Sequence, residues 1–340
     1  MQNIRYNVGQ DISLLSKPDF MVQNLKQLIE KFSDEQACRD FLVQQRWGGN
    51  PICPYCGSDK WYSIENGRRF KCGNNECYKK YSVTVGSIFH ASNIPLTKWF
   101  PAVYIILAHK KGISSIQLSK DLGVTQKTAW FMLHRIRESM KEKDSPLLGG
   151  TVEVDETYMG RKLASDYKGY TDQQIEQIMS SKQRSAQKGK GAVMGIAERG
   201  GNVRVRVFNE IDGKTAKQHI KDNVTPGSNV YTDRSSLYRT GLDEYNRESV
   251  NHGLVNPEWA RGDVHVNTLE SFFGMFKRGY YGIYHYMSYK HLQRYCDEFA
   301  YRRNTKQLKD GDRFELALTR IEGKLDYLTL VHGKSKKSQD

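Results

Sequence analysis

Two different hydrophobic periods follow one another along the chain, and the change lies near residue 150. Between Leu96 and Lys143, apolar residues recur with the spacing of helices. The segment Ser145–Gly150, which contains one proline and two glycines, interrupts this pattern. From Thr151 to Tyr158, apolar and polar residues alternate as they do in a strand. The pattern therefore predicts a helical region followed by a region that contains a sheet.

Strand and helix patterns are mixed downstream of Tyr158. The segments Ala192–Ala197 and Val203–Phe208, on either side of a turn with two glycines, predict a hairpin. The polar segment Lys162–Lys190, rich in lysine and glutamine, is expected to be a basic insert that forms a loop or a mobile segment with some helix. The other predicted elements are a helix at Lys214–Asp222, a strand at Asn229–Thr232, and helices at Asn267–Arg278 and Ser288–Arg303. This mixture indicates an α/β domain.

The charge of the chain suggests a class of partner. The 340 residues include 52 Lys and Arg against 38 Asp and Glu, which gives a net charge of +14. Such a balance favours polyanionic partners, nucleic acid first. No apolar run approaches the ~18–20 residues of a membrane-spanning helix, and no secretory signal is visible. We expect a cytoplasmic protein that is not a membrane protein, a secreted disulfide scaffold or a coiled-coil rod.

Four of the six cysteines lie in two short-spaced pairs. Cys53 and Cys56 are separated by two residues, Cys72 and Cys77 by four, and the two pairs by fifteen. Two such pairs can supply four thiolates to one tetrahedral zinc ion. With four protein ligands no coordination position is left for catalysis, so this zinc is expected to be structural.

The helical region contains a pattern typical of a helix-turn-helix. Apolar residues at helical spacing in Ile113–Leu122 are followed by Gly123-Val124-Thr125 and by a second predicted helix, Gln126–Met140. The start of the second helix is where base edges are read in such motifs. The residues predicted to contact bases are Thr125, Gln126, Lys127 and Thr128, and those predicted to contact phosphates include Lys110, Lys111, Arg135 and Arg137.

Acidic residues occur at three places where metal-dependent chemistry could be assembled. Asp155 lies near the end of the first predicted strand, and Asp233 ends another. Glu270 follows on a predicted helix, where it shares one polar face with Asn267, Gly274 and Lys277. Carboxylates are preferred ligands of Mg²⁺, and two such ions about 3.5–4 Å apart can cleave a phosphodiester. A basic residue on the same helix face can hold a DNA phosphate.

Several of these motifs, taken together, resemble a known family. They are the cysteine ribbon, the helix-turn-helix, VDETY at Val154–Tyr158, YTD at Tyr231–Asp233, NTLESF at Asn267–Phe272, KRG at Lys277–Gly279 and FAYRRN at Phe299–Asn304. The chain is similar, over about residues 35 to 305, to the DDE transposases of bacterial insertion sequences that carry an N-terminal zinc ribbon, the ISXO-like transposases. The NTLESF block is the most specific of these motifs.

The resemblance implies a fold, an activity and a set of site residues. It implies a ribonuclease H-like α/β catalytic domain, with a mixed sheet and flanking helices, that cuts and joins DNA with Mg²⁺. Asp155, Asp233 and Glu270 match the family's three acidic positions, expected to hold the Mg²⁺ ions, and Lys277 matches the basic residue seven positions after the glutamate. Lys277 is therefore expected to belong to the catalytic set, and Lys277 and Arg278 are predicted to contact DNA. Related transposases place an asparagine at the third position, so Asn267 is the alternative; Glu270 is favoured because a neutral amide binds Mg²⁺ more weakly.

The expected organisation has five parts. They are a helical adaptor at 1–50, a zinc ribbon at 51–95, a helix-turn-helix domain at 96–145, a catalytic domain at 150–305 with its insert at 162–190, and a C-terminal helix or tail at 306–340. Partners are expected to be the ends of an insertion sequence, its target DNA and further copies of the chain in a dimer or larger synaptic assembly on the bacterial nucleoid. Two alternatives stay open, a transposase-derived DNA-binding regulator without catalysis and a metal-dependent nuclease.

Overall fold

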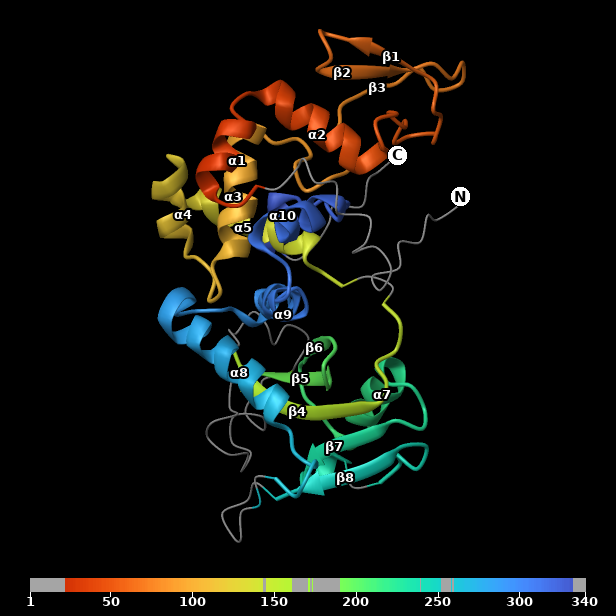
Figure 1. The fold of residues 1–340 in the computed structure, drawn as a ribbon, viewed down its shortest axis with the longest axis vertical. Helices are drawn as coiled ribbons and strands as arrows, with labels where there is room; N and C mark the ends of the chain where they lie inside the picture. Colours follow the sequence, from red (N-terminus) through yellow and green to blue (C-terminus); the bar gives the residue numbers. More distant parts are fainter. Residues whose placement is uncertain are drawn as a thin grey trace. The chain divides into compact units, whose positions relative to one another are not determined.

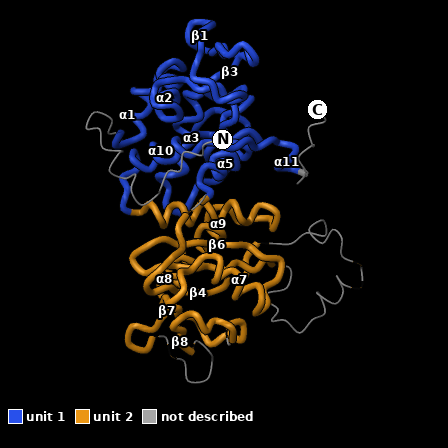
Figure 2. The backbone as a smooth tube through the Cα atoms, turned by 90° about the vertical axis from the view of Figure 1, so that its right-hand side faces the viewer, with its two compact units in different colours: residues 1–141, 307–340 blue, residues 142–306 orange. Residues whose placement is uncertain are grey.

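A computed structural model describes residues 22–142, 145–160, 171, 173, 190–238, 240–251, 258 and 260–332. The chain forms two compact units, shown in Figure 2: residues 1–141 together with 307–340, and residues 142–306. The predicted insert at 162–190 lies almost entirely outside the described residues. The boundary between the units falls a few residues before the predicted break at Ser145–Gly150.

The first unit combines a small sheet with a helical core. Its elements are α1 (Leu25–Lys31), α2 (Glu35–Trp47), β1 (Trp61–Ile64), β2 (Arg69–Cys72), β3 (Lys80–Tyr81), α3 (Leu96–Ala108), α4 (Ser115–Leu122), α5 (Gln126–Ser139), α10 (Asp310–Thr319) and α11 (Tyr327–His332). The three strands form an antiparallel sheet in the order β1-β2-β3 (Figure 1). The helix α2 begins at its cap Asp34, whose side chain accepts a hydrogen bond from Ala37, and it ends at Gly48 in the left-handed conformation.

The C-terminal segment completes the core of this first unit. Phe314 of α10 is fully buried, and its ring centroid lies 5.6 Å from that of Phe100 in α3. Arg313 donates a hydrogen bond to the carbonyl oxygen of Leu107 at 3.2 Å. The segment 306–340, predicted only as a helix or tail, therefore contributes a central helix to the N-terminal unit.

The second unit is built on a five-stranded mixed sheet. Its elements are β4 (Thr151–Met159), β5 (Gly191–Glu198), β6 (Val203–Phe208), α7 (Gly213–Asn223), β7 (Asn229–Asp233), η4 (Ser236–Tyr238), β8 (Asn246–Val250), α8 (Asn267–Gly279), the π-helical turn η5 (Tyr280–Tyr284) and α9 (Tyr289–Asn304). The strand order is β6-β5-β4-β7-β8, with β5 antiparallel to both of its neighbours and β4, β7 and β8 parallel. This is the arrangement of the ribonuclease H-like fold, which confirms the predicted fold class.

Helices cover both faces of this sheet. On one face, Leu269, Phe272, Phe273 and Phe276 of α8 pack with α9 against Val193 and Ala197 of β5 and Val203 of β6. On the other face, Ala216 and Ile220 of α7 pack against Val152 and Val154 of β4. The alternation of strand residues separates these two cores, so each position on β4 can be assigned to the α8 face or to the α7 face.

A glycine allows α8 to lie close to the sheet. Gly195 of β5 pairs with Asp155 of β4 and lies under α8. A Cβ atom at Gly195 would stand 2.8 Å from Cδ2 of Leu269 and 3.0 Å from Cζ of Phe273. Real side chains do not approach this closely, so any larger residue would push α8 away from the strand that carries Asp155.

We expect Gly195→Ala to destabilise the second unit by about 2 kcal/mol, because the added methyl group overpacks the interface under α8. In a unit of this size the midpoint of thermal unfolding should fall by roughly 5 °C. The measurement is thermal unfolding followed by circular dichroism. The control is Gly274→Ala on α8 itself, where an added Cβ meets nothing within 4 Å. An unchanged midpoint for Gly195→Ala would mean that α8 packs less closely than described.

Candidate active site and metal centre

Two aspartates lie side by side where two parallel strands end. The register of β4 and β7 pairs Val154 with Thr232, and the next residues are Asp155 and Asp233. Adjacent strands are about 4.8 Å apart, so these side chains are neighbours. Val154 and Val230 point into the core under α7. Because strand residues alternate, Asp155 and Asp233 point to the opposite face, which α8 covers.

Glu270 lies in the first turn of α8, on the same side of the sheet. The pKa of Asp155 is raised to about 7, first by burial and then by the negative charges of Glu156, Asp233 and Glu270. Glu270 has the smallest of these electrostatic effects. The structure thus places the three predicted acidic residues near one another, and their catalytic role stays a prediction.

Glu156, the neighbour of Asp155, lies in a different environment. It accepts a hydrogen bond from the hydroxyl of Tyr238, which belongs to the core under α7. Burial raises its pKa to about 7, the bond from Tyr238 opposes this shift, and the charge of Asp233 adds to it. Glu156 therefore points to the face expected from strand alternation, away from α8.

A buried glutamate connects the sheet to the start of α8. Glu153 is fully buried, and its Oε2 atom accepts hydrogen bonds from the backbone N–H groups of Thr268 at 2.7 Å and Leu269 at 3.2 Å. The hydroxyl of Thr268 donates to Oε1 at 2.9 Å. The helix has no side-chain cap of its own at Val266. Glu153, which lies two residues before Asp155 on β4, therefore accepts hydrogen bonds from the free N–H groups at the positive end of α8.

Arg199 and His265 complete this network. Arg199 pairs with Glu153 at 3.0 Å and contacts Nδ1 of His265 at 2.9 Å, and its guanidinium lies 5.0 Å from the ring centroid of Tyr231. The network joins β4, the end of β5, β7 and the segment before α8. No local sequence pattern indicates this role of Glu153, because its partners lie 46 and 115 residues away.

We expect Glu153→Gln to destabilise the second unit by about 3 kcal/mol, because Arg199 loses a buried partner and an amide N–H group must face other donors. The unfolding midpoint should fall by roughly 10 °C in differential scanning calorimetry. The matched control is Glu244→Gln, which removes the exposed pair between Glu244 and Lys221 (2.7 Å) and should cost less than about 1 kcal/mol. Equal effects of the two substitutions would contradict the structural role assigned to Glu153.

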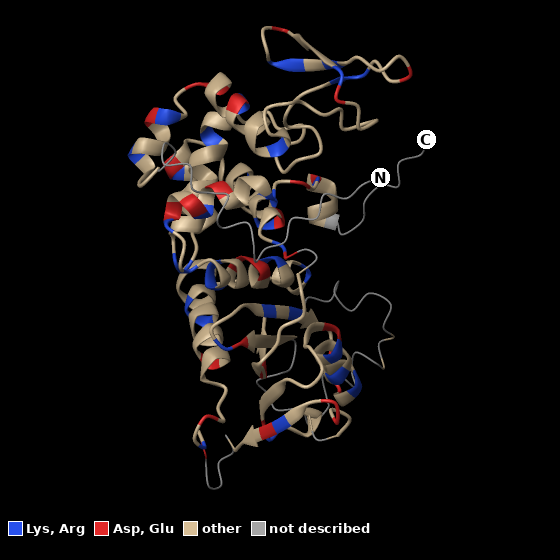
Figure 3. Ribbon diagram, turned by 45° about the vertical axis from the view of Figure 1, so that its right-hand side comes forward, with Lys and Arg blue, Asp and Glu red and all other residues tan. Residues whose placement is uncertain are grey.

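The exposed face of α8 is basic at its C-terminal end. Lys277 and Arg278 are exposed in the last turn, while Glu270 lies in the first. Figure 3 shows where basic and acidic residues occur along the ribbon. Asn267, the alternative third ligand, is exposed at the first position of the helix. The predicted division of α8 into an apolar and a polar face is confirmed by the burial of Leu269, Phe272, Phe273 and Phe276.

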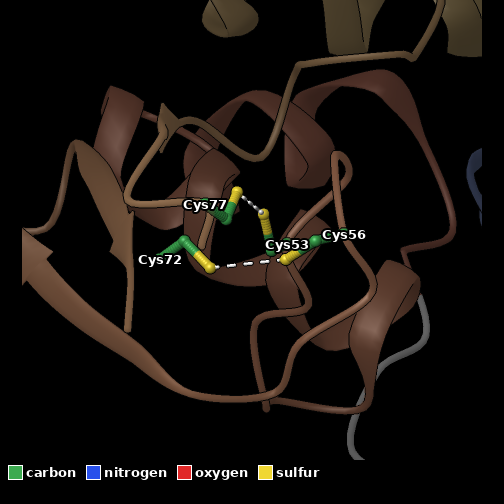
Figure 4. Close-up of side chains that lie close together, drawn as sticks. All are labelled: Cys53, Cys56, Cys72 and Cys77. Atoms are coloured by element: carbon green, nitrogen blue, oxygen red, sulfur yellow. Dashed lines mark hydrogen bonds between the residues drawn. The ribbon is translucent and has the colours of Figure 1, made fainter. Parts of the chain in front are cut away.

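In the first unit, the four clustered cysteines converge. Figure 4 shows their sulfur atoms pointing toward one another, with Cys56 and Cys72 3.5 Å apart and Cys53 and Cys77 3.8 Å apart. All four sulfurs lie within 4.8 Å of one another. A tetrahedral site with Zn–S bonds of about 2.3 Å requires sulfurs about 3.8 Å apart, so this set fits zinc. Among the residues that the structure describes, Asp155, Asp233 and Glu270 do not form a cluster as close as that of the four cysteines.

Comparison with known proteins identifies both parts of the chain. Residues 147–304 match the family described as the ISXO2-like transposase domain, and residues 33–80 match the transposase zinc-ribbon domain. Residues 147–304 belong to the ISXO2-like transposase domain family. The transposase-domain match includes Asp155, Asp233 and Glu270, and the zinc-ribbon match includes all four clustered cysteines.

Two individual proteins are similar to this chain. One is an uncharacterized protein in the transposable element ISH50 of Halobacterium salinarum, which is 29% identical over 268 residues, covering 74% of this chain and 84% of the relative. The other is a chain in the crystal structure of a pre-cleavage Mos1 transpososome, with 14% identity, a TM-score of 0.25, and coverage of 66% of this chain and 79% of that one. A TM-score this low supports no residue-level comparison.

The predicted helix-turn-helix of the transposase lies between the two matched regions. The helix α4 ends at Gly123 in the left-handed conformation, and α5 begins at its cap Thr125, which accepts a hydrogen bond from Thr128. Thr125, Gln126 and Lys127 are exposed, and Thr128 is half-buried. Gln126 donates to the hydroxyl of Ser115 at 2.8 Å. The helices and turn are therefore present as predicted, and DNA contact by their residues stays a prediction.

The prediction for Arg135 must be corrected. Its side chain is buried, donates to the carbonyl oxygen of His90, and lies over the rings of Trp99 and Phe131. Burial lowers its pKa to about 10. Arg137 is also buried. Neither guanidinium is placed to contact a phosphate, and Arg135 instead holds α5 against α3.

The transposase has no candidate for a membrane-spanning segment in the parts of the chain that the structure describes, since none of those helices is both long and apolar enough.

Proposed function

We propose that this transposase binds the terminal inverted repeats of an insertion sequence, cuts the DNA strand there, and joins the new 3′ end to a target. The observation that supports this proposal is that Asp155 and Asp233 end neighbouring parallel strands on the face covered by α8, which carries Glu270 in its first turn. All three residues lie within the region that matches a transposase domain. The net charge of +14 suits a protein that holds two DNA molecules.

The acidic residues fit divalent cations of the Mg²⁺ class. The negative charges of Asp233 and Glu270 contribute to the raised pKa of Asp155, and a positive ion would relieve this repulsion. Hard cations prefer oxygen ligands. Asp155 and Asp233 would hold Mg²⁺ from the strand ends and Glu270 from α8, with Asn267 as the alternative third ligand. When bound, two Mg²⁺ ions activate the attacking oxygen and stabilise the leaving one.

The protein's own contribution is to position the DNA. Lys277 lies seven residues after Glu270, about 10 Å along the same helix face, where it can neutralise a phosphate next to the cleaved bond. In the first step water replaces the 3′ oxygen at phosphorus, and a 3′-OH is released. In the second step that hydroxyl attacks a target phosphodiester, so that one P–O bond forms as another breaks.

The other unit would supply recognition. Thr125, Gln126 and Lys127 at the exposed start of α5 would contact bases, and Lys110 and Lys111 would contact phosphates. The zinc ion held by the four cysteines would stabilise the ribbon. Bringing two ends together requires a dimer or larger assembly of the chain, on the chromosome in the cytoplasm.

The test is a cleavage and strand-transfer assay with the full-length protein and labelled DNA that carries the element's own ends. We expect nicking with Mg²⁺ but not with Ca²⁺, and joined products from pre-cut ends. Specific binding without cleavage in Mg²⁺ or Mn²⁺ would instead identify a DNA-binding regulator. Cleavage without joining of pre-cut ends would identify a nuclease.

A further inference from the structure

An exposed tyrosine continues the line of polar residues on α8. Glu270, Gly274, Lys277 and Tyr281 follow at intervals of four, three and four residues, so they lie on one face of the helix and its continuation. Tyr281 is 67% exposed, the highest value among the large hydrophobic residues that the structure describes. A tyrosine ring exposed this far has lost most of the stabilisation that burial would give it.

The segment that carries Tyr281 is firmly held. Tyr281 belongs to the π-helical turn Tyr280–Tyr284, which is closed by a hydrogen bond from the N–H of His285 to the carbonyl oxygen of Tyr280 at 2.7 Å. The ring of Tyr284 packs 4.9 Å from that of Tyr295, and its hydroxyl donates to Glu298 at 2.5 Å. Single π-helical turns occur often at functional sites.

An unusual backbone conformation at His285 and a ring contact with Tyr280 also occur next to Tyr281. His285, at the end of the turn, has a φ of 54°, a conformation that residues other than glycine rarely adopt. The ring of Tyr280 meets that of Tyr281 edge-on at 5.1 Å. Tyr281 is therefore presented to solvent from a rigid support, which lowers the entropy cost of a contact with its ring.

The charges around Tyr281 indicate what its ring would contact. Lys277 and Arg278, one turn earlier, are exposed and positive, and Gly282 beside Tyr281 offers no side chain. An apolar protein surface would be poorly matched by two cations, whereas a nucleic acid strand offers both phosphates for the cations and flat bases for the ring. Tyr281 lies eleven residues from Glu270, or about 16 Å at 1.5 Å per residue, which equals roughly five nucleotides of a DNA strand.

We infer that Tyr281 stacks on an unpaired base of the DNA strand that is held at the acidic residues, within about five nucleotides of the cleaved bond. This inference rests on the proposed function and adds a binding site for one base to it. Stacking between a base and an aromatic ring would stabilise a locally opened end, since a base that leaves the duplex needs a new partner for its face.

The experiment combines substitution of Tyr281 in the protein with removal of single bases from the DNA, as in a double-mutant cycle. Binding of end DNA is measured by fluorescence anisotropy with the full-length chain in an Asp155→Asn background, so that no cleavage occurs. The DNA is either intact or carries one abasic site, moved in turn through the five positions on each side of the cleaved bond. We expect Tyr281→Ala to weaken binding of intact DNA roughly tenfold, or about 1.4 kcal/mol, and Tyr281→Phe to bind like the parent.

The decisive result is the position dependence. At one position the abasic site should abolish the penalty of Tyr281→Ala, because the base that the ring would contact is absent. The matched control is Tyr62→Ala, a tyrosine with 63% exposure in the first unit, whose effect should be the same on every abasic DNA. A Tyr281→Ala penalty below twofold, or one equal on all the DNAs, would overturn the inference while normal cleavage by the parent enzyme left the proposed function intact. Failure of the parent chain to bind end DNA would overturn both.

Discussion

Replacing Asp155 with asparagine will lower the rate of DNA strand cleavage on the order of 10³-fold, equivalent to about 4 kcal/mol of activation free energy. The amide keeps the size of the side chain but removes the charge that a divalent cation needs, at the point where β4 and β7 present two carboxylates side by side. The measurement is single-turnover nicking of end DNA in Mg²⁺.

The thermal stability of Asp155→Asn should rise, although its cleavage rate falls. Burial and three neighbouring acids raise the pKa of Asp155 to about 7, above that of an unfolded chain. A folded-state pKa that is raised means that the stability contributed by the protonated group is present at low pH and is lost as the pH rises through 7. At pH 8 without divalent metal, Asp155→Asn should therefore unfold at a higher temperature than the parent protein.

The two readouts together exclude misfolding as the cause of lost activity. The matched control is Asp243→Asn, an exposed aspartate between η4 and β8, which should change neither the cleavage rate nor the unfolding temperature. Cleavage by Asp155→Asn at the parental rate would contradict the assignment of this carboxylate to the metal site.

Substitution of Cys72 by serine should remove zinc and unfold the ribbon. The core of the ribbon contains few apolar residues, among them Phe70 and Tyr81, besides the cysteines themselves. The free energy of binding a structural zinc, roughly 10 kcal/mol or more, is therefore most of the stability of this part. We expect one zinc per parent chain, none in Cys72→Ser, and rapid proteolysis between residues 51 and 81 in the variant.

The unfolding of the second unit should remain unchanged in Cys72→Ser. Cys38→Ala is the matched control, since Cys38 is a buried free cysteine outside the cluster and its replacement should keep the zinc. Zinc content measured by atomic absorption tests the ligands directly. A full zinc complement in Cys72→Ser, with a protease-resistant ribbon, would show that the cysteines serve another purpose.

The parts that could be predicted from the sequence are those with strong local patterns. The residues Thr151–Asp155 of β4 alternate between polar and apolar types, and α8 separates its phenylalanines from its polar residues within four turns. The strand β8 was not predicted, because Asn246–Val250 is mostly polar and lies at the edge of the sheet, where pairing alone makes it a strand.

The parts that could not be predicted depend on contacts between distant residues. In the sequence, Glu153 is one more polar residue of a predicted strand. Only the structure shows that it accepts hydrogen bonds from the N–H groups at the start of α8. From the sequence, Arg135 is predicted to be a surface cation of a DNA-binding helix. In the structure, its side chain contacts Trp99 and donates to the carbonyl oxygen of His90. In both cases, a charged side chain is buried because partners far away in the chain satisfy it.

The position of α10 in the first unit has a consequence for biosynthesis. A ribosome makes this helix after the entire catalytic domain, yet Phe314 belongs to the same aromatic core as Phe100. The core of the first unit stays incomplete during synthesis until the residues of α10 have been added. A polypeptide that stops before α10 would therefore lack part of the core of the first unit even when all residues of the second unit have been made. Under the proposed function, such a chain would compete poorly with intact copies for the ends of the element.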